Sequence, residues 1–473
     1  MSNTRIARFR GERLLGVITS LPGIPHYNQE YIIQYIPRMA LNINKTRNGT
    51  HSMEFTASAR IPGNVYSDVS LPFVPASPSG LGGESVRPGL RVAFVVTRSD
   101  SFGGSSVHIR DLARVLMRAG HEVMVFIGGE GPVTEAYREA GIPYVALQHL
   151  IRKISPLTDL RGVWELRRAL RKFKPDLVST HTSKAGFLGR LAAWSLGIPA
   201  VYTPHCWSFT DGFPGARLYL WAERLARPFG RRIIMVSEAE RREGIKGRVG
   251  SPNHLVTVHN GMPDVPEQFR ANPKLSPVRL MMVGRFEKQK DHLTLFRALA
   301  QLKDLPWTLD NIGDGPLRPQ VESAIRELGL GDRINLHGYQ RDVVERMSQS
   351  QVFVLISNWE GFSRSIIEAM RAGLPVIASA VGGNAEAVED GRTGFIVQRG
   401  CVDGLAQRLR ALIDDPELRG KFGAAGRRRY EENFTFDQMV GKTIEVWGAV
   451  VGRNISLQPR VPAGAPAYAL RAA

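Results

Sequence analysis

Cysteine is scarce in this sequence, with only Cys206 and Cys401 among 473 residues. The two lie far apart and lack the spacing of metal ligands, which excludes a disulfide framework and is typical of a protein of the reducing cytosol. Cys206 follows His205, a pairing that can create a thiol nucleophile. No third residue that would orient such a pair is evident, so we rank a cysteine-based mechanism low.

Long hydrophobic runs are absent as well. No stretch approaches the roughly 18 apolar residues that a membrane-spanning helix needs. The segment from Arg5 to Arg13, followed by LLGVITSL, looks like the start of a secretion signal, but no small-residue cleavage site follows it. We therefore expect a cytoplasmic protein.

Acidic residues are too few to balance the basic ones. The chain has 62 Lys and Arg against 44 Asp and Glu, which gives a net charge of +18 and a pI near 10.2. Such a charge indicates an anionic partner: nucleic acid, an anionic lipid surface or a phosphorylated substrate. Residues 161–174 and 216–232 are basic and read as amphipathic helices, which slightly favours a membrane surface, although an ordinary helix with its stripe in the core fits equally well. Their apolar members are Trp164, Leu166 and Leu170, then Leu218, Trp221 and Leu225.

The chain is long enough for two or three domains. Residues 1–88 lack periodicity and end in a Pro-, Gly- and Ser-rich segment, so we expect a dispensable extension, either disordered or created by a start codon placed too early. From Arg91, short β-type runs alternate with helical patterns, as in a doubly wound parallel sheet. The alternation restarts at VRLMMVGRF, which predicts a first domain at 89–262 and a second at 263–433. Residues 453–473 are predicted to be a disordered tail.

The first strand is not followed by the G-x-G-x-x-G of a dinucleotide site, although Gly103 and Gly104 predict a tight turn there. A more informative stretch is NWEGFSRSIIEAMRAGLPVIAS, residues 358–379. Ser363 is a candidate N-cap, and Ile366, Ile367 and Met370 form the apolar stripe of a helix. The helix start offers unpaired N–H groups to a phosphate, and Glu360 and Glu368 on either side can bind sugar hydroxyls. The pattern therefore favours a sugar diphosphate ligand, although a surface glutamate and a core helix would explain this stretch alone.

Polar residues also follow other predicted strands. His181 and His205 each come after a strand, at the edge of the sheet where ligands bind in open α/β folds. Arg285 and Lys290 follow the first strand of the second domain, where both can point at one anion. Satisfied polar histidines and two surface cations are the simpler alternatives.

Several of these motifs together resemble the retaining glycosyltransferases of family 4, which have the GT-B fold. They are EGFSRSIIEAM with its E-x7-E spacing, GRFEKQKDH, VGGNAEAVEDGRTGFIV and HTSKAGFLGRLAAWSLGIPAV, the last of which resembles the bacterial exopolysaccharide, capsule and lipopolysaccharide enzymes. The likeness covers about 91–450. It implies an α/β protein with two Rossmann-like doubly wound parallel-sheet domains facing across a cleft, and a helix at 434–452 that crosses back to the first domain.

The resemblance also implies roles for individual residues. The implied catalytic residues are His205, Glu360, Arg285 and Lys290. The implied donor-binding residues are Gly103, Gly104, Arg285, Lys290, Tyr339, Gln340, Gly361, Phe362, Ser363, Arg364, Ser365 and Glu368, and the implied acceptor-side residues are His108, His181, Ser183 and Lys184. The second glycine turn, at 381–386, is expected to be structural, although Glu386 is a further candidate for the base or ribose. The chain departs from the family at Cys206, where glycine is common, which leaves the shape of the acceptor pocket open. It also departs at Ala380, where an acidic residue is common, so no role is assigned to that position.

The implied reaction is sugar transfer with retention from a nucleotide sugar, UDP-linked by default with GDP or ADP as alternatives, to a lipid-linked or oligosaccharide acceptor in cell-surface polysaccharide biosynthesis. No Asp-x-Asp pair occurs, so we predict no metal site and no cofactor, with Arg285, Lys290 and a helix N-terminus stabilising the leaving diphosphate. We expect the enzyme to act at the cytoplasmic face of the inner membrane. Three alternatives remain: a nucleotide-sugar epimerase of the same fold, a non-catalytic polysaccharide-assembly protein, and a nucleic-acid-binding protein, for which no recognition motif is present.

Overall fold

The computed structural model of this chain describes residues 44–45, 51–52, 89–100, 103–210, 215–340 and 343–458. The chain divides into two units, Met1–Pro72 and Phe73–Ala473. In the first unit, β1 (Asn44–Lys45) pairs antiparallel with β2 (His51–Ser52). The rest of the predicted extension at 1–88 lies outside the described residues, as does the predicted tail from 459 onward.

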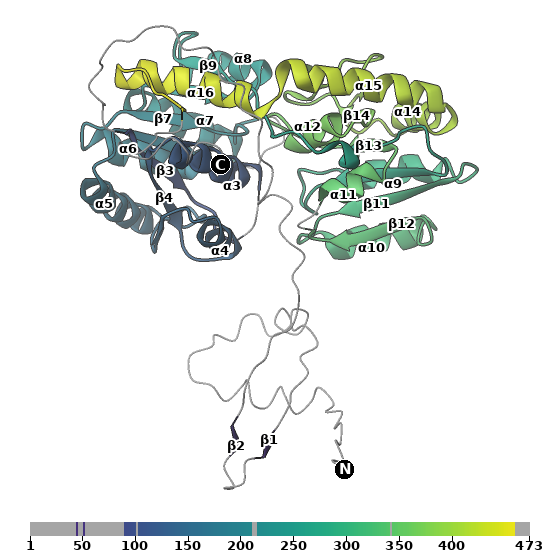
Figure 1. The fold of residues 1–473 in the computed structure, drawn as a ribbon, viewed down its shortest axis with the longest axis horizontal. Coiled ribbons are helices and arrows are strands. Elements are labelled where there is room, and N and C mark those ends of the chain that lie inside the picture. The colour runs from purple at the N-terminus through teal and green to yellow at the C-terminus, as the bar shows by residue number, and fades with distance from the viewer. Residues whose placement is uncertain are drawn as a thin grey trace, which may run out of the picture. The chain divides into compact units, whose positions relative to one another are not determined.

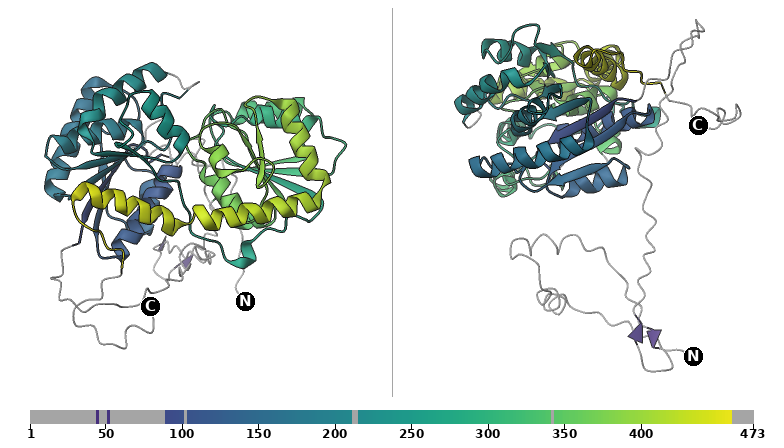
Figure 2. Two further views of the ribbon diagram at one scale, coloured as in Figure 1. Left: turned by 90° about the horizontal axis from the view of Figure 1, so that it is seen from above. Right: turned by 90° about the vertical axis from the view of Figure 1, so that its left-hand side faces the viewer.

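The second unit contains two parallel sheets with helices on both faces (Figures 1 and 2). The first lobe has a seven-stranded sheet in the order β5-β4-β3-β6-β7-β8-β9. Its strands are β3 (Arg91–Val96), β4 (Glu122–Gly128), β5 (Tyr144–Leu147), β6 (Leu177–His181), β7 (Ala200–Thr203), β8 (Arg232–Met235) and β9 (Leu255–Thr257). Its helices are α3 (Gly104–Arg118), α4 (Pro132–Glu139), α5 (Pro156–Phe173), α6 (Ser183–Trp194), α7 (Ala216–Ala226) and α8 (Glu238–Lys246), with a short 3-10 turn η1 (Arg227–Phe229).

The second lobe has a six-stranded parallel sheet in the order β12-β11-β10-β13-β14-β15. Its strands are β10 (Val278–Val283), β11 (Trp307–Ile312), β12 (Ile334–Gly338), β13 (Val352–Leu355), β14 (Val376–Ser379) and β15 (Gly394–Val397). Its helices are α9 (His292–Ala300), α10 (Arg318–Glu327), α11 (Val343–Ser348), α12 (Arg364–Arg371), α13 (Asn384–Ala387), α14 (Val402–Asp414) and α15 (Pro416–Asn433), and the 3-10 turn η2 (Glu267–Phe269) lies in the connection between the lobes.

The central strands are apolar throughout because both faces of each sheet are covered. In β3, every residue from Val92 to Val96 is buried, and in β13 all four residues from Val352 to Leu355 are buried. A strand covered on only one face would instead alternate apolar and polar residues. The predicted doubly wound α/β fold with two Rossmann-like domains is confirmed.

The final helix, α16 (Phe436–Val451), packs on the first lobe. Phe436, Met439 and Trp447 belong to the same hydrophobic cluster as β3 and α3. Residues 453–458 continue onto this lobe, which corrects the predicted start of the tail. Arg453 forms an ion pair of 2.9 Å with Asp176, and the His121 ring is 2.7 Å from the Ser456 carbonyl oxygen. No helix of the described ranges has the length and apolarity that crossing a membrane requires.

In each sheet, the direction in which successive strands are added reverses at one point. The chain runs from β3 outward through β4 and β5, then returns beside β3 as β6, and it does the same around β10 and β13. Ligands in open α/β folds bind beyond the carboxyl ends of the strands at such points. The loops after β3, β6, β10 and β13 are therefore where a site is expected.

Candidate active site at the junction of the lobes

The loop after β13 leads into α12, whose N-terminus lacks a side-chain cap. Ser363 occupies the predicted N-cap position, but its Oγ lies 3.0 Å from Ser365 Oγ and makes no capping bond. The first-turn N–H groups of α12 are consequently available to an anion. The predicted stripe of Ile366, Ile367 and Met370 is fully buried and holds the helix against the sheet.

Glu360 and Lys290 form an ion pair. Both side chains are nearly buried, at 8% and 12% exposure. Glu360 also accepts hydrogen bonds from Ser357 Oγ at 2.8 Å and from Gln289 Nε2 at 3.3 Å. The stem of Lys290 packs over Gly284, where a Cβ would meet it at 3.0 Å. The carboxylate predicted for the sugar and the cation predicted for the diphosphate are therefore in contact.

Arg285 follows Gly284 at the end of β10 and lies close to the first lobe. It forms an ion pair of 3.1 Å with Glu287. Burial lowers the pKa of Arg285, Glu287 opposes this shift, and Arg98 and Arg152 of the first lobe lower it further. This clustering of positive charge suits an anionic ligand.

Glu368 lies in the second turn of α12. Burial raises its pKa, and the nearby Arg371 and Arg364 oppose the shift. Arg364 reaches across the junction, where its guanidinium is 3.3 Å from the Asp111 carboxylate of α3. Sequence reasoning missed Asp111, because nothing local marks a partner 253 positions away.

The predicted glycine turn lies at the same place. Gly103 is the N-cap of α3, and its carbonyl oxygen accepts the N–H groups of Ser106 and Val107 at 3.1 and 3.2 Å. A Cβ on Gly104 would lie 3.2 Å from Arg364 Cδ. The structure thus brings the glycine turn next to α12, and a role in donor binding stays a prediction.

Three predicted histidines form one group in the first lobe, in which His108 and His181 are buried and His205 is half-buried. The ring centroids of His108 and His205 are 5.1 Å apart, and those of His181 and His205 are 5.2 Å apart. His181 Nδ1 lies 2.9 Å from His205 Nε2, and His181 Nε2 lies 3.0 Å from Ser179 Oγ. Burial holds the pKa of all three well below the usual value, so the imidazoles are neutral near pH 7.

The remaining predicted residues are placed less centrally. Ser183 Oγ is 2.6 Å from Ser208 Oγ, and Lys184 forms an ion pair of 2.5 Å with Asp159. Tyr339 follows β12 with its side chain exposed, and Gln340 donates to the His337 carbonyl at 2.8 Å. Both residues follow the carboxyl end of β12, at the same edge of the second sheet as Arg285, which follows β10.

Gly361 permits an unusually close approach of the two lobes. A Cβ at this position would lie 2.2 Å from the His205 carbonyl oxygen and 3.0 Å from Glu240 Oε1. His205 itself has a φ of 64°, which turns its carbonyl toward Gly361. A Cβ on Gly383 would similarly meet Ser237 Cβ at 2.6 Å.

Phe362, the next residue, is buried at the same junction. Its carbonyl oxygen accepts a hydrogen bond of 2.9 Å from Asn260 Nδ2, and its ring lies 4.8 Å from that of His259. Phe362 therefore links the loop between β13 and α12 of the second lobe to residues 259–260 at the end of the first lobe.

Glu240 and Cys206 lie behind this contact, and neither was predicted as a site residue. Glu240 is 2% exposed, its Oε2 accepts the Val236 N–H at 3.2 Å, and its Oε1 has no hydrogen-bond partner. Burial raises the pKa of Glu240 to about 8. Burial, together with the carboxylates of Glu240 and Glu360, also raises the pKa of the Cys206 thiol well above normal. A protonated thiol is a poor nucleophile, which argues against cysteine chemistry.

Glu240 should make the stability of the protein depend on pH. The folded carboxyl has a pKa of about 8 against 4.5 without burial, so its contribution is full below pH 4.5 and is lost as the pH rises to about 8. We expect the melting temperature of the wild type to fall relative to Glu240→Gln by about 5 °C or more between about pH 5 and pH 9. Melting curves of both proteins across this range test the prediction, and a difference that does not change with pH would contradict it.

Glu386 has a structural position, as expected for the turn at 381–386, and a contact with the base or ribose stays a prediction. Its carboxylate accepts the N–H groups of Glu238 and Ala239 at 2.8 and 2.6 Å and lies 2.9 Å from His259 Nε2. It therefore caps the N-terminus of α8 and joins the lobes.

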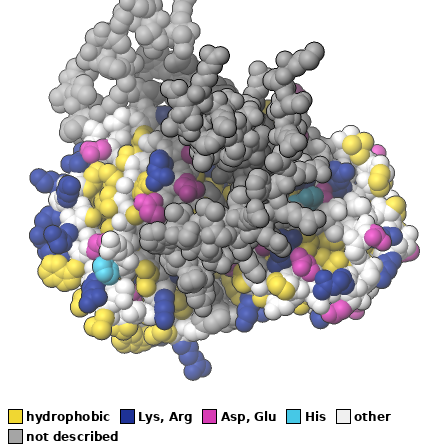
Figure 3. Space-filling view, turned by 90° about the horizontal axis from the view of Figure 1, so that it is seen from below, with side chains coloured by type: hydrophobic (Ala, Val, Ile, Leu, Met, Phe, Trp, Pro, Cys, Tyr) yellow, Lys and Arg dark blue, Asp and Glu magenta, His cyan; other side chains and the backbone are white. Residues whose placement is uncertain are grey.

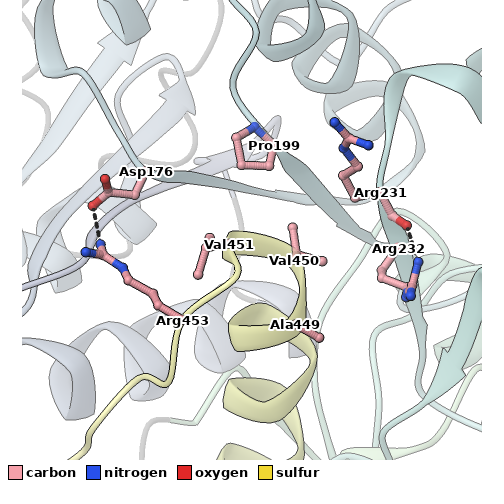
Figure 4. A pocket seen from close by; sticks show the side chains of 8 residues that line it. All are labelled: Asp176, Pro199, Arg231, Arg232, Ala449, Val450, Val451 and Arg453. Carbon is pink, nitrogen blue, oxygen red and sulfur yellow. Dashed lines mark hydrogen bonds and ion pairs between the residues drawn. The ribbon is translucent and has the colours of Figure 1, made fainter.

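A pocket of about 670 Å³ lies on the opposite edge of the first sheet (Figure 4). Its lining includes Asp176, Pro199 and Arg232, which stand at the amino ends of β6, β7 and β8, and the end of α16 closes it. The predicted site residues follow the carboxyl ends of the strands, so this pocket is separate from the candidate site.

The comparisons with known proteins agree with this geometry. Residues 103–261 match a family model described as a glycosyl transferase 4-like domain, and residues 264–429 match glycosyl transferases group 1. The chain is 30% identical over 307 residues to the UDP-Gal:alpha-D-GlcNAc-diphosphoundecaprenol alpha-1,3-galactosyltransferase of Escherichia coli, covering 61% of this chain and 79% of that one. It is 27% identical to the capsular polysaccharide biosynthesis glycosyltransferase CapM of Staphylococcus aureus, covering 62% and 82%.

Among solved structures, HepE of Anabaena in complex with UDP-glucose has a similar fold. The TM-score is 0.68 at 22% sequence identity, covering 76% of this chain and all of that chain. Two doubly wound lobes that meet at their carboxyl edges form the GT-B fold. The chain belongs to the glycosyl transferases of group 1, with a glycosyl transferase 4-like first lobe.

Proposed function

We propose that this enzyme transfers a sugar, with retention of its anomeric configuration, from a nucleotide sugar to a hydroxyl group of a lipid-linked or oligosaccharide acceptor in cell-surface polysaccharide biosynthesis. A UDP-sugar is the first candidate, because the Escherichia coli relative is named for UDP-Gal and the HepE structure holds UDP-glucose. A lipid-linked acceptor is supported by the diphosphoundecaprenol in the name of the same relative.

One observation carries the proposal: an uncapped helix N-terminus lies among cations at the carboxyl edge of a doubly wound sheet. Lys290 pairs with Glu360 in the loop that leads into α12, and Arg285 lies within the electrostatic reach of Arg98 and Arg152 of the first lobe. A diphosphate placed there would meet both main-chain donors and fixed positive charge. Glu368, one turn into α12, would then accept a hydrogen bond from ribose, and Glu360 from hydroxyls of the transferred sugar.

The reaction needs no enzymic nucleophile. The bond between the sugar C1 and the diphosphate oxygen breaks, and the acceptor oxygen forms its bond to C1 on the same face. The acceptor proton passes to the departing phosphate oxygen. Arg285, Lys290 and the amides of α12 stabilise the charge that develops on the diphosphate, in place of a metal or another cofactor. Neutral His205 and His181 would line the acceptor side together with His108, Ser183 and Lys184, and the approach of the lobes would exclude water.

The proposed donor is cytosolic, so we propose a cytoplasmic enzyme. Its net charge of +18 supports a peripheral position at the inner membrane.

Nucleotide binding by the full chain provides the first test. At a ligand concentration of 100 times Kd, binding stabilises the folded state by about 2.7 kcal/mol. We expect UDP or a UDP-sugar to raise the melting temperature by several degrees in a panel that also contains GDP- and ADP-sugars, and Glu368→Ala to lose most of this shift. The absence of any shift across the panel would contradict the proposal. Isomerised donor in the absence of acceptor would indicate an epimerase instead, and neither transfer nor donor hydrolysis would indicate a non-catalytic protein.

A further inference from the structure

Hydrophobic exposure is concentrated on one part of the first lobe. Of the thirteen large hydrophobic side chains that are exposed among the described residues, nine belong to α5, α6, α7 or the loop before α5. They are Ile151, Ile154, Leu157, Leu160 and Trp164, then Trp194, then Leu218, Trp221 and Leu225. We refer to these nine residues and the basic residues between them as the α5–α7 face.

The outer side of α5 combines apolar and basic side chains. Leu157, Leu160 and Trp164 are 77%, 59% and 59% exposed, whereas Leu166 and Leu170 are buried in the core. The predicted stripe of Trp164, Leu166 and Leu170 was therefore wrong, because Trp164 points away from the other two. Exposed cations accompany the outer residues: Arg152, Lys153, Arg161, Arg168, Arg171 and Lys172.

The carboxylates of this segment are directed inward. Asp159 pairs with Lys184, and Glu165 accepts the backbone N–H groups of Gln148 and His149, both at 2.9 Å. The side chains of Asp159 and Glu165 are only 16% and 26% exposed. The charge that α5 presents to solvent is consequently positive.

Helix α7 repeats the arrangement independently. Leu218, Trp221 and Leu225 share one side of the helix and are 61%, 64% and 49% exposed. Glu223 faces inward and forms a buried ion pair of 2.6 Å with Arg190. The predicted amphipathic stripe of α7 therefore faces solvent rather than the core.

The two helices belong to one surface. Arg167 of α5 donates to Ser195 Oγ, just past the end of α6, at 3.0 Å. The neighbouring Trp194 ring lies 5.2 Å from that of Phe229, which follows α7. Figure 3 shows basic and hydrophobic side chains side by side at the outer edge of the first lobe.

We propose that the α5–α7 face docks on an anionic lipid bilayer. Exposed Trp and Leu can enter the boundary between headgroups and acyl chains while Arg and Lys contact lipid phosphates. A nucleic acid would pair with the cations but would leave nine apolar side chains in water, so the bilayer is the better partner. The orientation also fits the site, because Lys153 at the start of this face bonds through its carbonyl to Lys184 on the predicted acceptor side. The idea that docking brings a lipid-linked acceptor to the Lys184 side of the site rests on the proposed function, whereas the docking itself does not.

Vesicle flotation of the full chain tests the docking. We expect the wild type to float with vesicles of phosphatidylcholine containing about 30% phosphatidylglycerol, and to bind pure phosphatidylcholine at least about tenfold more weakly. The double variant Trp164→Glu/Trp221→Glu should lose at least about tenfold in binding to the anionic vesicles. Leu275→Glu is the matched control, because Leu275 is 55% exposed outside this face, and it should bind like the wild type.

Equal binding of the double variant and the wild type would overturn the proposal, as would equal binding to neutral and anionic vesicles. A DNA duplex that displaced the vesicles from both proteins equally would point to a nucleic-acid partner and overturn it as well. Melting temperatures confirm that the variants fold. Stabilisation by UDP, measured in parallel, separates the docking proposal from the proposed function. A protein that is stabilised by UDP but does not bind vesicles would contradict the docking and leave the proposed function unaffected.

Discussion

Replacing Arg285 with alanine is expected to lower kcat by a factor on the order of 10²–10³ while the protein stays folded. The side chain is a partly exposed guanidinium at a strand end, so its removal leaves no cavity in the core. Its charge lies where the departing diphosphate is proposed to become more negative. Initial rates with saturating donor and acceptor measure the effect, and the melting temperature reports folding.

Two further variants sharpen the test of Arg285. Arg392→Ala is the matched control, because Arg392 lies in the same lobe and, like Arg285, pairs with a nearby glutamate, Glu389 at 2.8 Å. It should keep wild-type kcat. Arg285→Lys should recover part of the lost activity, since it restores the charge without the planar donor geometry. Near-normal turnover in Arg285→Ala would remove this residue from the proposed mechanism.

Substituting Gly361 with alanine should lower kcat about as strongly as Arg285→Ala, but through a steric clash rather than through the loss of a charge. The new Cβ would lie 2.2 Å from the His205 carbonyl oxygen, so the lobes would have to separate by about 1 Å. A displacement of this size can cost about 100-fold in kcat when reacting groups lie on opposite sides of a junction. The cores of both lobes are untouched, so we expect the melting temperature to change little.

Gly331→Ala provides the comparison for Gly361. Gly331 belongs to the same lobe, and a Cβ there would have no neighbour within 4 Å. Its kcat should equal that of the wild type. If Gly361→Ala turned over normally, the close approach of the lobes would not be needed for the reaction.

Much of the architecture was readable from local sequence. The five consecutive apolar residues of Val92–Val96 and the alternation with helical patterns predicted parallel sheets, because a sheet covered on both faces needs continuous apolar strands. The stretch around Glu360 and Glu368 was likewise identified correctly as a loop followed by a helix and a strand. The three-residue strand β9 was not predicted, since Leu255–Thr257 is too short to show a period.

The site was predicted less completely, because its contacts join residues far apart in the chain. Asp111 pairs with Arg364, and Glu386 caps α8, and neither partner carries a local mark of the other. Glu240 reads as an ordinary charged residue of a helix, yet tertiary packing buries it and raises its pKa to about 8. Ser363 stands where a cap is expected, but its hydroxyl bonds to Ser365 instead.

The amino-acid sequence by itself determined the two doubly wound lobes, the family and the candidate residues, because hydrophobic periodicity and short motifs are local properties. Only the tertiary structure decided which side of α5 and α7 meets solvent, that Lys290 and Glu360 pair, and that Gly361 contacts the His205 carbonyl. Burial, proximity and the pKa shifts that follow from them depend on which segments pack together, and that packing is a property of the whole fold.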